Sequence, residues 1–75
     1  MLLFMNVVEV FKTNVAEHNE ARQLIQHLLA HFPQFKINFD LHDCDKILRV
    51  EGKQVPPQKI IELITMHGYQ CHALE

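Results

Sequence analysis

The sequence is poor in glycine and cysteine, with two of each among its 75 residues. Two cysteines are too few for the disulfide framework that stabilises small secreted domains. Two glycines leave no glycine-rich loop that could cradle a phosphate, and no nucleophile-elbow motif is present. We therefore find no signature of an enzyme and expect a non-enzymatic protein.

Basic charge and long apolar runs are also scarce. Seven Lys and Arg against nine Asp and Glu give a net charge of −2, so a nucleic-acid backbone would meet no basic stripe. No stretch approaches the roughly 20 apolar residues of a membrane span. The apolar start, Met1–Met5, lacks the basic region and cleavage site of a signal peptide. We expect a cytoplasmic protein without nucleic-acid or membrane partners.

The hydrophobic content of 48% is that of a globular protein, and the length suits one domain over residues 1–75. Alternating apolar residues predict strands over 6–12, 35–41, 46–51 and 69–74. Val8 and Val10 are expected to face the core, opposite Glu9. Helical spacing predicts a helix over 17–31, and a second helix opens at Pro56-Pro57 and ends before Gly68.

This order predicts an α+β, ferredoxin-like βαββαβ two-layer sandwich, with a four-stranded antiparallel sheet and two helices on one face. Strands one and two run the same way with strand three between them, and strand four lies against strand one. Three loops then share one end of the sheet. The residues gathered there are Thr13, Asn14, Glu17, His18, His42, Asp43, Cys44, Asp45 and His67.

The segment Val55–Tyr69, with its proline-led helix, Ile-rich face and Gly-Tyr turn, resembles the second helix of heavy-metal-associated domains. The size and element order agree over nearly the whole chain. That family includes small copper chaperones and the N-terminal domains of metal-pumping ATPases. The resemblance implies the same fold and a role related to metal transport.

The family binds soft ions through a Met-Thr-Cys-x-x-Cys loop between the first strand and helix. Here Lys12 stands for the methionine and Thr13 matches the threonine, but Asn14 and Glu17 replace the two cysteines. Two thiolates at that spacing are what hold Cu(I). A two-thiolate Cu(I) site therefore cannot form in this loop.

A different metal site is conceivable at the same end, from Glu17, His18 and His67. In the family, the loop before strand four lies beside the metal loop, and His67 matches that position. Imidazole and carboxylate ligands suit divalent Zn, Ni or Co better than Cu(I). The alternative is structural: Asn14 caps the helix, Glu17 complements its N-terminal dipole and His67 stabilises a helix C-terminus.

Three further groups have simpler interpretations. His42 and Cys44 belong to a turn, 42–45, that offers four potential ligands but is typical of a solvated hairpin with an exposed thiol. His27 and His31 lie one helical turn apart, at the edge of the apolar stripe. Cys71 is expected to be a small buried residue of the last strand.

Two functions follow. The leading hypothesis is weak binding of a divalent Zn-, Ni- or Co-type ion at a degenerate soft-metal site. The alternative is a protein-interaction module, in which the edge strands two and four pair with a partner protein or form a homodimer.

Overall fold

The fold was obtained as a computed structural model, which describes residues 6–74. It is α+β, and its elements follow the expected order. They are β1 (Val7–Thr13), α1 (His18–His31), β2 (Lys36–Asp40), β3 (Ile47–Gly52), α2 (Pro57–Met66) and β4 (Cys71–Leu74). The last strand is shorter than expected, because residues 69 and 70 belong to the loop before it. The interpretation of Met1–Met5 lies outside the described residues.

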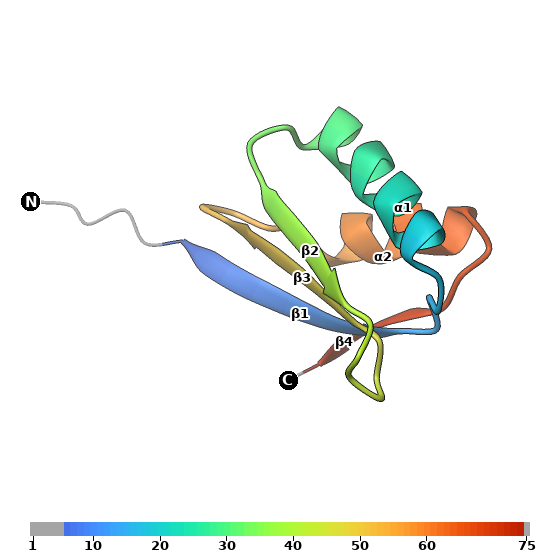
Figure 1. Cartoon of the computed structure of the whole chain (residues 1–75). Helices are drawn as coiled ribbons and strands as arrows, with labels where there is room; N and C mark the ends of the chain where they lie inside the picture. The colour runs from blue at the N-terminus through green and yellow to red at the C-terminus, as the bar shows by residue number, and fades with distance from the viewer. Residues whose placement is uncertain (1–5, 75) are drawn as a thin grey trace, which may run out of the picture.

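The four strands form one antiparallel sheet in the order β2-β3-β1-β4. The expected α+β class, with four antiparallel strands in one sheet and two helices, is confirmed. Figure 1 shows α1 and α2 on the same face of the sheet, so one sheet face is covered and the other is open. Among the described strands, β2 and β4 each have one edge that pairs with no other strand.

The covered face of β1 carries Phe11 and Thr13, which are 0% and 6% exposed. The expectation that Val8 and Val10 face the core is wrong, because Val8 is 49% exposed and Val10 only half-buried. The register explains the difference. Phe11 pairs with Leu48, which is fully buried, and side chains paired across an antiparallel ladder point to the same face.

Both helices begin without a side-chain cap. Asn14 does not cap α1 as the sequence suggested; Glu17 occupies the N-cap position instead, and its carbonyl accepts the amide of Ala21 at 3.0 Å. At the end of α2, Gly68 adopts a φ of 91°, the left-handed conformation expected there. In residues 6–74, neither helix has the length and apolar character required to span a membrane.

Candidate functional site

Three loops meet at the end of the sheet where β1 finishes. The amide of Thr13 donates to the carbonyl of Asp45 at 3.0 Å, and its hydroxyl donates to the carbonyl of Lys46 at 2.6 Å. The Asn14 side chain accepts the amide of Gln70 at 2.8 Å, so it binds the loop before β4. The expected gathering of loops is confirmed. Asn14 joins two of them.

Glu17 and His18 lie at the start of α1 and are both exposed. The ring of His18 faces the β2–β3 turn, where its centroid lies 6.5 Å from that of His42, with the ring planes at 60°. His18 also lines a cavity between α1 and β2. This side chain is therefore directed toward the free edge of the sheet.

His67 lies on the opposite side of α1. It is the residue that ends α2, and its ring stacks on that of His27, with centroids 4.2 Å apart and planes at 29°. Glu17, His18 and His67 therefore do not converge. Within residues 6–74, one group of three His, Cys, Asp or Glu side chains has ligand atoms all within 4.8 Å, and it is formed by Asp43, Cys44 and Asp45.

The Asp43–Asp45 group is the tip of the hairpin, and its own hydrogen bonds account for its shape. The Asp43 carboxylate accepts the amide of Asp45 at 2.8 Å, and the Asp43 carbonyl accepts the amide of Lys46 at 3.0 Å. Asp45 also lies 3.7 Å from the ammonium of Lys12. Lys46 has a φ of 48°, as turns often require. These contacts support the interpretation as a hairpin turn.

The stacked imidazoles of His27 and His67 join α1 to the end of α2. A second contact lies beside them, between Glu20 of α1 and Tyr69, where a side-chain hydrogen bond to the carboxylate raises the pKa of the tyrosine hydroxyl. Glu20 and His27 are two helical turns apart, so both contacts use the same flank of α1. Both histidines are exposed, which leaves their ring nitrogens open to an ion from solvent.

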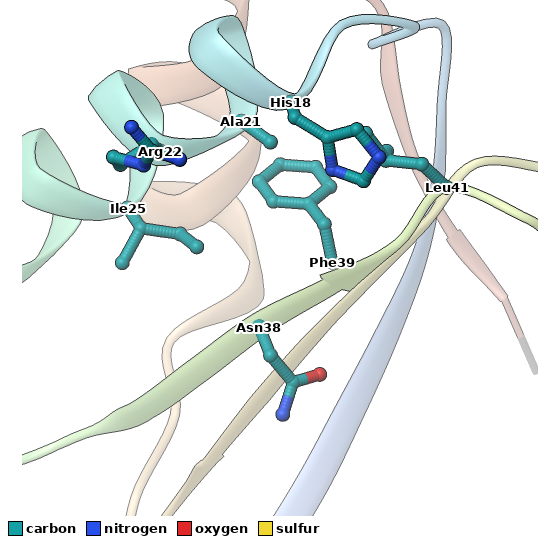
Figure 2. Close-up of a pocket in the computed structure, with 7 residues that line it drawn as sticks. All are labelled: His18, Ala21, Arg22, Ile25, Asn38, Phe39 and Leu41. Carbon is teal, nitrogen blue, oxygen red and sulfur yellow. The ribbon is translucent and has the colours of Figure 1, made fainter.

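A cavity of about 260 Å³ opens on the other flank of α1, against the edge strand β2. Figure 2 shows Phe39 rising from β2 toward the helix, whereas Asn38 points away from it. The α1 side chains around the cavity are those of His18, Ala21, Arg22 and Ile25, and Leu41 closes it from the strand end. Its walls are thus partly apolar, with an exposed guanidinium at the rim.

The two cysteines should differ sharply in reactivity. Burial raises the pKa of the Cys71 thiol to about 12, whereas Cys44 is exposed at the hairpin tip. At pH 8 we expect a thiol-reactive reagent to modify Cys44 promptly, and to modify Cys71 only after denaturation. Counting modified thiols with and without denaturant measures this. A Cys44→Ser variant should show no prompt modification, and prompt modification of that variant would contradict the burial of Cys71.

Sequence reasoning missed two features of this region. It paired His27 with His31, whose Nδ1 instead donates to the His27 carbonyl at 3.1 Å, and it did not associate His27 with His67. It also missed the cavity beside Phe39. The sequence does place His27 and Ile25 on opposite flanks of α1. It does not say which flank packs beside α2 and which beside β2, because that depends on how the helices pack on the sheet.

Comparison of the chain with models of known protein families, with curated proteins and with solved structures finds no match. Its resemblance to the heavy-metal-associated family therefore stays a prediction, based on the residues named above.

Proposed function

We propose that this chain is a non-enzymatic, ferredoxin-like domain of the heavy-metal-associated type whose thiolate site has been replaced. Four antiparallel strands in the order β2-β3-β1-β4, with both helices on one face, support the fold (Figure 1). Thr13 supports it locally, because a threonine at the family position here fastens β1 to the start of β3. Asn14 and Glu17 then leave that loop without a soft ligand.

The function we propose is weak binding of a borderline divalent ion, Zn²⁺, Ni²⁺ or Co²⁺, by the imidazoles of His27 and His67. The stacking of the two rings at 4.2 Å is the observation that carries this proposal. Two nitrogen ligands of one such ion lie roughly 3.3 Å apart, since each bond is about 2.0–2.1 Å long. The lone pairs of imidazole nitrogens lie in the ring planes, so the stacked side chains must rotate out of the stack before one ion contacts both nitrogens.

Two protein ligands alone make a weak site, and water completes the coordination shell. Imidazole nitrogen is a borderline ligand, which favours these divalent ions over Cu(I). The exposure of both rings means that the ion enters without any opening of the fold. Binding also joins α1 to the end of α2, so it stabilises the folded state by RT ln(1 + L/Kd), where L is the free ion concentration, and this rises with the logarithm of that concentration above Kd.

A metal titration followed by NMR of the histidine rings tests this function. Zn²⁺ and Ni²⁺ should perturb His27 and His67 first, and His27→Ala or His67→Ala should weaken binding at least about tenfold, because each removes one of two ligands. The matched control is His31→Ala, one turn along the same helix, which should bind as the wild type does. His18→Ala tests the loop at the start of α1.

The outcomes separate the sites clearly. If His18→Ala weakens binding and His67→Ala does not, the ion binds at the hairpin end instead, and the His27–His67 site is wrong. If perturbations spread evenly over all six histidines, binding is unspecific and the proposed function fails.

A further inference from the structure

The outer edge of β2 is the longer of the two free sheet edges among the described strands. β2 runs over Lys36–Asp40 and pairs only with β3, whereas β4 has four residues. Unpaired backbone groups along such an edge are able to accept another strand. The flank of α1 above this edge carries half-buried Ile25 and Leu29. Apolar side chains there are thus only partly covered by the chain itself.

We infer that two copies of this chain associate through β2, antiparallel and centred on Asn38, into a continuous eight-stranded sheet. The alternation of β2 carries the first step of the inference. Asn38 lies on the open face with its two polar neighbours at positions 36 and 40, while Ile37 and Phe39 lie on the covered face. Side chains opposite one another across an antiparallel pair share a face. A register that pairs the polar residues of one β2 with the polar residues of the other therefore places the helices of both copies on the same face of the joined sheet.

Charge then selects one register. Centring the pair on Asn38 places Lys36 opposite Asp40 of the partner subunit, and Asp40 opposite the partner's Lys36. Both side chains are exposed, and the ion pair between Lys12 and Asp45 involves neither of them. A shift of the copies by two residues places Lys36 opposite an uncharged residue. The two-fold symmetric register thus forms two ion pairs that the isolated chain does not have.

The covered face is compatible with the same register. Ile37 of each copy lies opposite Phe39 of the partner subunit, and Phe39 forms a wall of the cavity below α1. Both side chains are half-buried in the single chain. An apolar side chain arriving at this edge buries surface beside Ile25. The cavity thus provides room for the partner's isoleucine.

The other edge offers no comparable match. β4 consists of Cys71, His72, Ala73 and Leu74, so it carries no pair of opposite charges for a copy to complement. The preference for β2 therefore depends on its charge pattern and on the cavity beside Phe39.

Analytical ultracentrifugation of the metal-free protein, from about 10 μM to about 1 mM, tests the inference. We expect a reversible monomer–dimer equilibrium for the wild type. Lys36→Asp and Asp40→Lys should each weaken association at least about tenfold, because two attractive pairs become two repulsive pairs. The double variant K36D/D40K should associate as the wild type does, since it restores both pairs with the charges exchanged.

Mixing the two single variants is the most stringent test of the proposed register. Lys36→Asp and Asp40→Lys should form a one-to-one heterodimer with about the affinity of the wild type, although each variant alone associates at least about tenfold more weakly. Asp40 also accepts the amide of His42 at 3.2 Å, so circular dichroism must show that each variant is folded. A wild type that stays monomeric throughout would overturn the inference. So would association that is indifferent to both charge changes, or single variants that remain apart when mixed.

Discussion

Phe11→Ala is expected to lower the free energy of unfolding by about 3–5 kcal/mol. Phe11 is 0% exposed and lies on β1, an inner strand, where it pairs with Leu48 on one side and Ala73 on the other. Removing the ring leaves a cavity that the two neighbouring strands hold open. A domain of this length has little stability to spare, so the variant should be largely unfolded at room temperature.

The matched control lies three residues away on the open face of the same strand. Val8 is 49% exposed, so Val8→Ala should cost about 0.5 kcal/mol or less. Urea denaturation followed by circular dichroism measures both values. Equal losses for the two variants would show that the covered face of β1 has been assigned wrongly.

The sequence pattern of β1 does not reveal which of its two faces is buried. Four of the five residues from Val7 to Phe11 are apolar, so the alternation is set by Glu9 alone, and its charge suggested that Val8 and Val10 face inward. Glu9 is in fact half-buried on the covered face, because it shares that face with Val50 and Phe11. β2 has no such ambiguity, since polar and apolar residues alternate in it strictly.

The candidate site could be predicted only in part, for a related reason. Strand order places the three loops at one end, and the bonds of Thr13 and Asn14 confirm that they meet there. The side-chain orientation of a histidine at a helix end depends on the elements packed beside it. The local sequence pattern therefore cannot predict it. His67 follows α2 and stacks on His27, whereas His18 begins α1 and faces the hairpin.

Gly52 shows the same dependence on distant packing. The sequence pattern predicts a strand that stops at Glu51, just before this glycine. In the structure Gly52 is the last residue of β3, where it pairs with Val7 and is buried. An added Cβ would lie 2.5 Å from Cδ1 and 2.7 Å from Cε1 of Phe35. Glycine is therefore required here because the phenyl ring of Phe35 lies directly against the backbone.

Gly52→Ala should lower the free energy of unfolding by about 1–3 kcal/mol, because the ring must move to admit one methyl group. The ring is not free to move. Phe35 is 6% exposed and stacks on Phe32, with centroids 5.0 Å apart and planes at 16°. Urea denaturation again measures the loss, and a smaller near-ultraviolet circular dichroism signal should accompany the displaced aromatic ring.

A double-mutant cycle with Phe35→Leu identifies the cause. The shorter leucine leaves room above residue 52, so Gly52→Ala should cost less than half as much in that background. If the cost is the same in both backgrounds, the loss comes from the strand backbone and not from the ring. A smaller cost beside Leu would show that the phenyl ring of Phe35, just before β2, is what excludes a side chain from position 52 at the end of β3.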